Sequence, residues 1–314
     1  MPRVLVAGSF NVDHVWTAAR LPHPGETLGG RYATGPGGKG FNQAVAARRA
    51  GADTTFVCAL GGDAGGELAR DLARGDGIDL REAPSAAPTG TAGIYLDEAG
   101  NNSIVIGAGA NADLTADFVA AQADAFADAA VVLVQLESPA PAILAALQRA
   151  RAGGALAMLN PAPANAEVGA ELLATSDIVT PNETEFAGLL ERRGGRSPSG
   201  AGAGALPDAQ LHALCRELLP HGTVVLTLGG AGCFVSHADD RRRGDAGSCY
   251  RVAAAPATVV DTTGAGDAFN GALAASLALR PTAPFAAHVD FATRYAAAST
   301  EREGAAAAMP RLTA

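Results

Sequence analysis

The chain contains 314 residues, of which 48% are hydrophobic and 18% are charged, so it can bury the core of one large α/β domain. Its formal net charge of −9 argues against a protein that binds the phosphate backbone of nucleic acids, because such a protein needs a basic face. Since the sequence has neither an apolar run of about 18 residues nor a signal-peptide pattern, we expect no membrane span and a cytoplasmic location.

Short apolar segments rich in β-branched residues alternate with segments of helical periodicity along most of the chain. Such alternation is typical of a mostly parallel sheet covered by helices on both faces. The sequence therefore predicts one doubly wound α/β domain over residues 1–314, with ligands at the carboxyl ends of its strands. We expect strands at 4–9, 54–60, 131–136, 156–160, 177–182 and 223–229, and helices at 40–50, 64–74, 139–152 and 208–219.

Three segments interrupt this alternation. Residues 14–34 and 89–109 are partly polar, contain Gly, Pro and Asn turns, and have the pattern of antiparallel hairpins without helices between their strands. We expect them to form a small β-sheet lid that projects from the main sheet. Residues 194–205 (GGRSPSGAGAGA) have no apolar period, so we expect a flexible surface loop without an assigned function.

A first glycine-rich loop, TGPGGKGFNQA, covers residues 34–44. Gly35, Gly37 and Gly40 match Gly-x-Gly-x-x-Gly, but the loop does not directly follow a core strand and no acidic residue lies at the expected distance. Lys39 is followed by glycine, which excludes a P-loop. We therefore expect no dinucleotide site here.

Polar side chains in this loop are suited to a ligand with several hydroxyl groups. Lys39 and Asn42 lie at the start of a helix, and Asn11 and Asp13 follow the first strand. A carboxylate can accept two hydroxyl hydrogen bonds, while amide and ammonium groups donate. Ordinary turn chemistry is the alternative interpretation of Asn11 and Asp13.

Acidic residues also follow two later strands. Glu137 ends one of them and is either a charge at a loop start or an acceptor for sugar hydroxyls. In TPNETE, Asn182 can cap the next helix, and Glu183 and Glu185 can hold waters around Mg²⁺; both interpretations can be true together. The glycine turn in 227–235 could support a flat nucleotide.

A second glycine-rich turn, DTTGAGDAFNGAL, leads into a strongly helical segment. Unpaired amides and the helix dipole make such a helix start a cradle for an anion, and Gly264 and Gly266 allow a close approach. We expect this cradle to hold a phosphoryl group during transfer, with Asp267 kept ionised as a general base. The simpler interpretation is that Asp267 is only a favourable carboxylate at a helix start.

The motifs GGKGFNQA and DTTGAGDAFNGAL, in this order and about 220 residues apart, resemble those of the ribokinase-type (phosphofructokinase-B-like) sugar kinase family. The resemblance extends from Val4 to about Pro310 and includes GSFNVDH, LPHPGET, VQLESP, LNPAPA and TPNETE. It implies a kinase that uses ATP and Mg²⁺, is activated by K⁺, and forms a homodimer through the lid. It also implies that ATP phosphorylates the 5-hydroxyl of ribose.

The resemblance assigns roles to individual residues. The catalytic group would be Asp267, with Gly264, Ala265 and Gly266 as the anion hole. The sugar would be bound by Asn11, Val12, Asp13, Gly38, Lys39, Gly40, Phe41, Asn42, Glu137 and Asp267. The nucleotide and its Mg²⁺ would be bound by Asn182, Glu185, Thr227, Leu228, Gly229, Gly230, Ala231, Gly232, Gly266 and Thr293. The K⁺ ligands would come from Asp261, Thr263, Ser299, Arg302, Gly304 and Ala308.

Three residues depart from the family pattern. Ala308 replaces a usual Ser near the cation, Thr293 replaces a His or Asn beside adenine, and Phe41 replaces a small residue in the sugar loop. We therefore expect weaker K⁺ dependence, altered base selectivity and altered fit near the sugar. Two alternatives remain at this point: a kinase for deoxyribose, fructose, another keto-sugar or a nucleoside, and a non-catalytic sugar sensor.

Overall fold

A computed structural model describes residues 3–194 and 200–312 of the chain. In these residues, the centre of the fold is a sheet of nine strands. From one edge to the other the strands are β13 (Cys249–Val252), β12 (Cys233–His237), β11 (Thr223–Thr227), β10 (Ile178–Val179), β9 (Leu156–Leu159), β8 (Ala129–Val134), β1 (Arg3–Ala7), β4 (Asp53–Gly61) and β5 (Asp79–Ser85). All neighbours from β11 to β5 pair in parallel, and β12 and β13 add an antiparallel edge.

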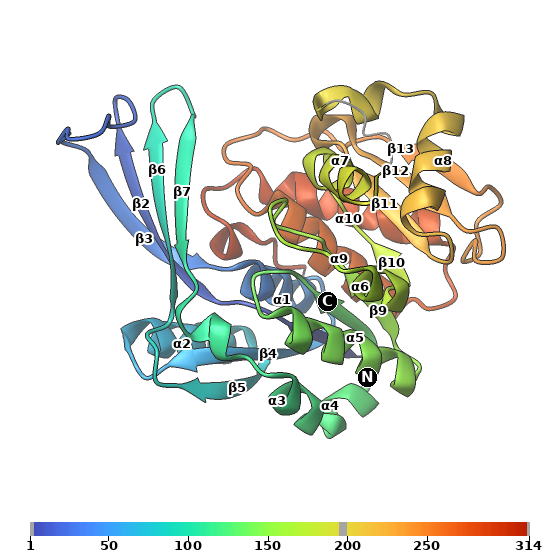
Figure 1. The fold of residues 1–314 in the computed structure, drawn as a ribbon, viewed down its shortest axis with the longest axis horizontal. Coiled ribbons are helices and arrows are strands. Elements are labelled where there is room, and N and C mark those ends of the chain that lie inside the picture. The colour runs from blue at the N-terminus through green and yellow to red at the C-terminus, as the bar shows by residue number, and fades with distance from the viewer. Residues whose placement is uncertain (1–2, 195–199, 313–314) are drawn as a thin grey trace.

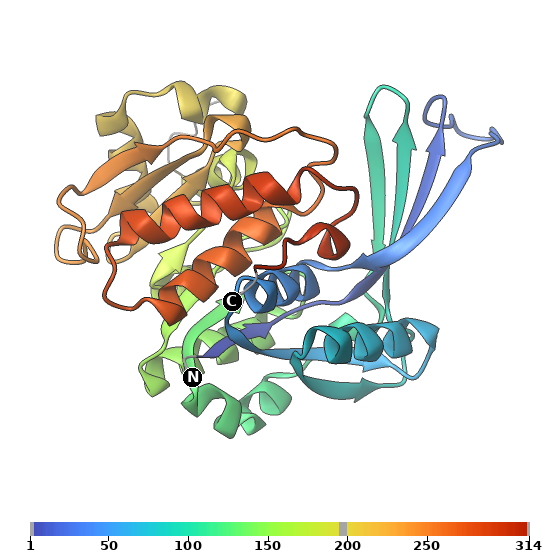
Figure 2. The ribbon, with the colours of Figure 1, turned by 180° about the vertical axis from the view of Figure 1, so that it is seen from behind.

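Helices cover both faces of this sheet, so the predicted doubly wound architecture is confirmed (Figures 1 and 2). One face packs against α1 (Lys39–Arg49), α2 (Ala64–Asp76), α9 (Ala265–Leu279) and α10 (Phe285–Ser299). The other packs against α3 (Ala116–Ala121), α4 (Ala123–Ala127), α5 (Ala140–Gly153), α6 (Ala170–Thr175), α7 (Glu183–Arg192) and α8 (Asp208–Leu218). No helix within the described ranges is both long enough and apolar enough to cross a membrane.

The two predicted hairpins form a separate four-stranded sheet in the described part of the chain, and it projects from the main body (Figure 1). Its order is β3 (Arg31–Gly37), β2 (Asn11–Ala18), β6 (Gly90–Asp97) and β7 (Asn102–Gly107). The β2–β3 and β6–β7 pairs are antiparallel, and β2 and β6 pair in parallel. We call this sheet the lid. Because β2 begins at Asn11, residues 11–13 belong to the base of the lid.

The expectation of a flexible loop at 194–205 is wrong for its last part. Residues Gly200–Ala205 form a 3₁₀ helix, and the Ala203 side chain is fully buried in the core. The Gly204 amide donates to the Glu183 carboxylate at 2.9 Å, and Arg251 donates to the Gly204 carbonyl at 2.9 Å. Small side chains permit this close packing, which a pattern of hydrophobicity does not reveal. Residues 195–199 lie outside the described ranges.

Candidate active site

Polar groups of the predicted sugar site meet where β1 and β8 end, beside the base of the lid. Glu137 follows β8, and its Oε2 accepts hydrogen bonds from Ser9 Oγ at 2.6 Å and from the Lys39 amide at 3.0 Å. The Ser9 carbonyl in turn accepts from the Phe41 amide at 2.9 Å. These bonds tie the glycine-rich loop at the start of α1 to the strand ends.

Asp267 lies in the first turn of α9 and is 7% exposed. Its two carboxylate oxygens accept hydrogen bonds from consecutive residues of α1: Oδ2 from Asn42 Nδ2 at 3.0 Å, and Oδ1 from Gln43 Nε2 at 2.9 Å. Burial raises the pKa of Asp267, and the positive charge of Lys39 and the two amide donors partly oppose this. The environment therefore makes this carboxylate more basic than an ordinary aspartate, and its ionisation in the reaction stays a prediction.

Lys39 and Asp13 add opposite charges to this cluster. Burial raises the pKa of Asp13 to about 7, and repulsion by Glu137 and Asp267 adds to the effect, while Lys39 lowers it. Burial alone would lower the pKa of Lys39, but the surrounding carboxylates, Asp267 first and then Glu137, raise it. The site thus holds one ammonium group among several partly buried carboxylates.

Asn11 is buried at the start of β2 and is held by a residue that the sequence analysis missed. Asn111 Nδ2 donates to Asn11 Oδ1 at 2.8 Å and to the Phe10 carbonyl at 3.0 Å, and Asn111 Oδ1 accepts from the Phe10 amide at 3.0 Å. Asn111 therefore fixes both the backbone and the side chain at the base of the lid.

The prediction that the Phe41 side chain alters the fit near the sugar is wrong. Its ring is 1% exposed and packs in the core, with its centroid 5.0 Å from the ring of Phe10 and 5.8 Å from that of Phe56. Only the backbone of Phe41 belongs to the loop. The Val12 side chain likewise packs against the core. The loop needs glycine at Gly38 (φ +88°) and Gly40, because a Cβ at either position would collide with the backbone of residues 8–11.

The turn before α9 keeps part of the predicted anion cradle available. Gly264 adopts φ +75°, a conformation that favours glycine, and a Cβ there would lie 2.9 Å from Ala305. The Ala265 amide is already bonded to the Thr262 carbonyl at 3.1 Å, so it is not free as predicted. Among the described residues, no hydrogen bond uses the amides of Gly264, Gly266 or Asp267. Those three amides are therefore available as donors.

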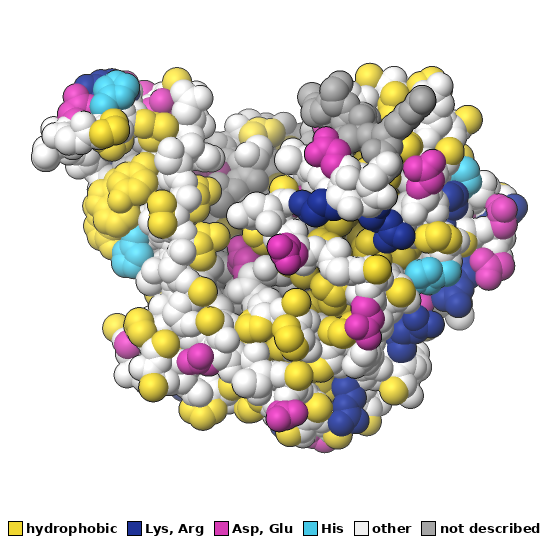
Figure 3. Space-filling model, viewed as in Figure 1, with side chains coloured by type: hydrophobic (Ala, Val, Ile, Leu, Met, Phe, Trp, Pro, Cys, Tyr) yellow, Lys and Arg dark blue, Asp and Glu magenta, His cyan; other side chains and the backbone are white. Residues whose placement is uncertain are grey.

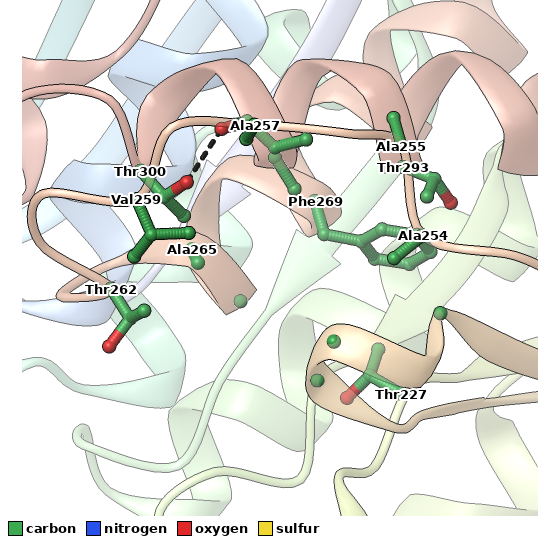
Figure 4. Close-up of a pocket in the computed structure, with 16 residues that line it drawn as sticks. Thr227, Ala254, Ala255, Ala257, Val259, Thr262, Ala265, Phe269, Thr293 and Thr300 are labelled. Atoms are coloured by element: carbon green, nitrogen blue, oxygen red, sulfur yellow. Dashed lines mark hydrogen bonds between the residues drawn. The ribbon is translucent and has the colours of Figure 1, made fainter.

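A cavity of about 510 Å³ opens beside this turn. Figure 4 shows it between the glycine turn that carries Thr227 and the segment that carries Val259 and Thr262, next to Phe269 and Ala254. Of the predicted nucleotide residues, its lining includes Thr227, Gly229, Gly230, Gly232, Gly266 and Thr293. The Leu228 side chain instead packs in the core on the other side of the sheet, and the Thr293 hydroxyl donates to the Val289 carbonyl at 2.8 Å.

The apolar part of this lining was not predicted from the sequence. Small and apolar residues such as these carry no local signal that separates a cavity wall from a core. The apolar residues that were not predicted are Ala254, Ala255, Ala257, Val259, Phe269, Ala296 and Ala297. Thr262, Thr300 and the predicted Ala265 also line the cavity.

Asn182 and Glu185 form a complete capping box at the start of α7. Asn182 Oδ1 accepts from the Glu185 amide at 2.8 Å, and Glu185 Oε2 accepts from the Asn182 amide at 2.9 Å. Burial raises the pKa of Glu185. The Glu183 carboxylate turns to Gly204 instead. The capping interpretation is confirmed, and one Glu185 oxygen stays outside the box.

Three of the predicted cation-site residues are joined by hydrogen bonds. Asp261 Oδ1 accepts from the Thr263 amide at 2.9 Å, and Oδ2 accepts from the Gly304 amide at 2.8 Å. Burial alone would raise the pKa of Asp261, but the Thr263 side chain and the amides of Gly304 and Thr263 together lower it. The Ser299 hydroxyl donates to the Ala296 carbonyl, Ala308 is a buried methyl group, and Arg302 is exposed. No group of three or more His, Cys, Asp or Glu side chains suited to a metal occurs in the described residues.

Comparison with known proteins places the chain among sugar kinases. It is 36% identical over 309 residues to a ribokinase of Haemophilus influenzae, covering 97% of this chain and 94% of the relative. It is 38% identical over 283 residues to a bifunctional ribokinase/ribose-5-phosphate isomerase A of Fructilactobacillus sanfranciscensis, of which this match spans about half (88% of this chain, 49% of the relative).

The fold agrees with these sequence matches. The structure of Arabidopsis thaliana ribokinase complexed with ribose and ATP superposes with a TM-score of 0.82 at 30% identity, covering 98% of this chain and 95% of the other. The family model described as pfkB family carbohydrate kinase matches residues 1–312. The chain therefore belongs to the pfkB family of carbohydrate kinases.

Proposed function

We propose that this chain transfers the γ-phosphoryl group of ATP to the 5-hydroxyl of ribose, with Asp267 as the general base. One observation carries the proposal: a buried carboxylate with a raised pKa lies at the start of α9, next to backbone amides that have no partner among the described residues and to a cavity of about 510 Å³. The curated ribokinase relatives at 31–38% identity support ribose as the substrate.

The sugar would be held by the polar cluster between the lid and the strand ends. Asp13, Glu137 and Asn42 Oδ1 would accept hydrogen bonds from its hydroxyl groups, and Asn11 and Lys39 would donate. The Oδ1 atom of Asn42 is buried and has no protein partner among the described residues, which supports its use by a ligand. The backbone of Gly38 and Gly40 would allow the sugar to approach the loop closely.

Chemistry would then occur between the sugar and the cavity. Asp267 would take the proton of the attacking hydroxyl, and its raised pKa makes it the stronger base. The amides of Gly266 and Asp267, together with the helix dipole of α9, would stabilise the negative charge on the transferring group. Movement of the lid toward the site would exclude water.

The nucleotide would occupy the 510 Å³ cavity, with its base against the apolar wall at Phe269 and Ala254. Mg²⁺ usually keeps several waters and binds few carboxylates besides the phosphates, and Asn182 and Glu185 fit that requirement as outer partners. When bound, this ion neutralises phosphate charge. These assignments, with those of Leu228 and Ala231 as backbone contacts, remain predictions.

A monovalent cation would bind beside the turn at Asp261. The pKa of the Asp261 carboxyl is lowered, so this group is charged at neutral pH and suits a cation. Backbone carbonyls would supply the other ligands, from Thr263, Ser299, Arg302, Gly304 and Ala308. Its chemistry would be to strengthen the positive field at the start of α9.

The lid would also form a homodimer contact. Trp16 on β2 stacks between Tyr32 and Tyr95, with ring centroids 5.3 Å apart in both pairs, and Val105 on the same face is 68% exposed. Figure 3 shows hydrophobic side chains gathered on the lid. Exposed apolar groups of this kind favour contact with a second copy. The cytoplasmic location also stays a prediction.

The test measures ADP release with Mg²⁺, ATP and K⁺ across ribose, deoxyribose, fructose and a nucleoside. The proposal expects the highest kcat/KM with ribose. A higher value with another substrate would replace ribose by that substrate. Ribose binding without any ADP release would favour a sugar sensor.

A further inference from the structure

We propose that Gln43 is a positioning residue for the reaction, because its side-chain amide fixes the Asp267 carboxylate in the orientation that takes the proton. Gln43 Nε2 donates to Asp267 Oδ1 at 2.9 Å, and the Gln43 side chain is fully buried. Lys39 and Gln43 are four residues apart, so they lie on the same face of α1. This inference rests on the proposed role of Asp267.

The orientation of the Gln43 amide is fixed by a chain of partners that ends at the backbone. The Thr180 carbonyl can only accept, so Asn160 must direct its Nδ2 toward it, at 3.0 Å. Asn160 Oδ1 then faces Gln43 Nε2 at 3.0 Å. Gln135 Nε2 donates to Gln43 Oε1 at 2.5 Å. The Gln43 NH₂ group is thereby directed at Asp267, and a flipped amide would place two acceptors against each other.

The same network reaches the other half of the catalytic turn. The Thr180 hydroxyl donates to Asn270 Oδ1 at 2.6 Å, and Asn270 Nδ2 donates to the Gly266 carbonyl at 2.8 Å. The Gly266 carbonyl belongs to the peptide unit that carries the free Asp267 amide. The carboxyl ends of β8, β9 and β10 thus hold the carboxylate and an anion-hole donor in one rigid arrangement.

Charge explains why a neutral amide is used at this contact. Lys39 from α1, Glu137 from the end of β8, Asp13 from the lid and Glu185 from α7 all act on Asp267. Burial and these carboxylates favour the protonated form, which cannot act as a base. A donor from Gln43 favours the ionised form without adding a charge that would repel Lys39 or attract another anion.

The test compares Gln43→Met with Gln135→Met. Methionine keeps the approximate size of glutamine and removes the amide. In Gln43→Met, Asp267 loses one of its two side-chain donors, whereas in Gln135→Met the contact with Asp267 is retained. Both side chains are fully buried, so each substitution removes a buried amide of the same size. Gln43→Leu, which removes the amide without adding a charge, provides a second variant in case Gln43→Met does not fold.

Two readouts distinguish positioning from a merely structural role. Carboxyl ¹³C NMR of the ligand-free full chain, assigned with Asp267→Asn, follows the titration of Asp267. We expect its pKa to rise by about one unit in Gln43→Met and by much less in Gln135→Met, as loss of a charge-assisted hydrogen bond implies. The acid limb of kcat/KM should move to higher pH by a similar amount, and kcat measured on its own acid limb should fall roughly tenfold with little change in sugar KM.

Equal titration of Asp267 in the wild type and both Gln43 variants would overturn the proposal, as would equal loss of kcat in Gln43→Met and Gln135→Met. The proposed function fails separately: normal turnover of Asp267→Asn removes the base assignment, while the NMR titration still decides whether Gln43 acts on that carboxylate.

Discussion

Asn42 Nδ2 donates to Asp267 Oδ2 at 3.0 Å, although 225 residues separate them in the sequence. This bond links the glycine-rich start of α1 to the glycine-rich start of α9. The two segments pack along one face of the sheet (Figure 2), so the predicted sugar loop and the predicted catalytic turn form one unit. Disturbing either segment should therefore affect the chemistry.

Replacing Asp267 by Asn tests the centre of this unit. We expect kcat to fall by ~10²-fold or more while sugar affinity is nearly unchanged, because the amide keeps the shape but cannot take a proton. Stopped-time ADP release and calorimetric sugar binding provide the two measurements. Asp71→Asn, at an exposed residue of α2, is the control. Turnover close to that of the control would contradict the assignment.

Replacing Asn111 by Ala tests the support of the lid base. The change leaves buried polar groups of Phe10 without partners and frees Asn11, so we expect a loss of about 1–3 kcal/mol in the free energy of unfolding and a higher sugar KM at similar kcat. Urea unfolding and steady-state kinetics measure these effects. Asn101→Ala, in the exposed turn between β6 and β7, should change neither. An unchanged sugar KM in Asn111→Ala would show that Asn11 does not need this support.

Much of the fold could be predicted because buried parallel strands have a continuous apolar pattern. The first strand and the strands at 54–60 and 131–136 have it, and all three occur near the predicted positions. β5 lacks it: DLREAPS alternates charges at the edge of the sheet, so no apolar run marks it. The 3₁₀ helix at Gly200–Ala205 was missed because burial of small side chains there depends on partners elsewhere in the chain.

The glycine turn before α9 could be predicted because its glycines, its carboxylate and the following helix are adjacent in sequence. Ser9, Gln43 and Asn111 could not, since their partners lie about 100 residues or more away. The spacing of Lys39 and Gln43 on one helix face was the available signal. Phe41 illustrates the opposite problem: its position in a motif does not tell which way the ring points, and packing against Phe10 decides it.

The pKa of Asp13 predicts how sugar binding depends on pH. This pKa is raised to about 7, so Asp13 becomes protonated as pH falls through 7 and loses acceptor capacity for hydroxyl groups. We expect sugar affinity to weaken below pH 7 in the wild type. In Asp13→Asn the sugar affinity should be weaker at every pH and should lose this pH dependence. Calorimetry at pH 5.5 to 8.5 measures both affinities. A parallel pH dependence in the two proteins would argue against Asp13 as the titrating group.

The same shift has a consequence for stability. A carboxyl whose pKa is higher in the folded state stabilises the fold below its unfolded pKa of 3.8, and this contribution is lost as pH rises through about 7. Asp13→Asn should therefore raise the free energy of unfolding of the sugar-free protein at pH 8, by roughly 1–3 kcal/mol, and change it little at pH 4. Urea unfolding at the two pH values measures this, and equal effects at both would contradict the prediction.

The aromatic row on the lid predicts the effect of a charge on assembly. Trp16 is 38% exposed between two tyrosines, and a lysine there would have to be desolvated in a dimer. We expect Trp16→Lys to be monomeric in sedimentation at concentrations where the wild type is dimeric. Leu312→Lys, at an exposed apolar residue outside the lid, should leave the mass unchanged. A wild-type monomer, or a dimeric Trp16→Lys, would contradict the lid contact.

Ala308 predicts the strength of cation activation. Its methyl group is buried in the segment that follows Gly304, whose amide is bonded to Asp261. Because this methyl group offers no side-chain oxygen, the proposed cation would rely on backbone carbonyls and on the Asp261 charge. Ala308→Ser adds an acceptor, so we expect half-activation at several-fold lower K⁺ concentration. We also expect a small loss of stability when K⁺ is absent, since a buried hydroxyl without a partner is unfavourable.

ADP release against KCl, with tetramethylammonium chloride holding ionic strength constant, measures the first effect, and thermal unfolding with and without KCl measures the second. Ala307→Ser, at the exposed neighbour, is the control. If wild type, Ala308→Ser and Ala307→Ser all respond to K⁺ in the same way, residue 308 does not face the cation. If none of them responds to K⁺, the proposed cation site itself is wrong.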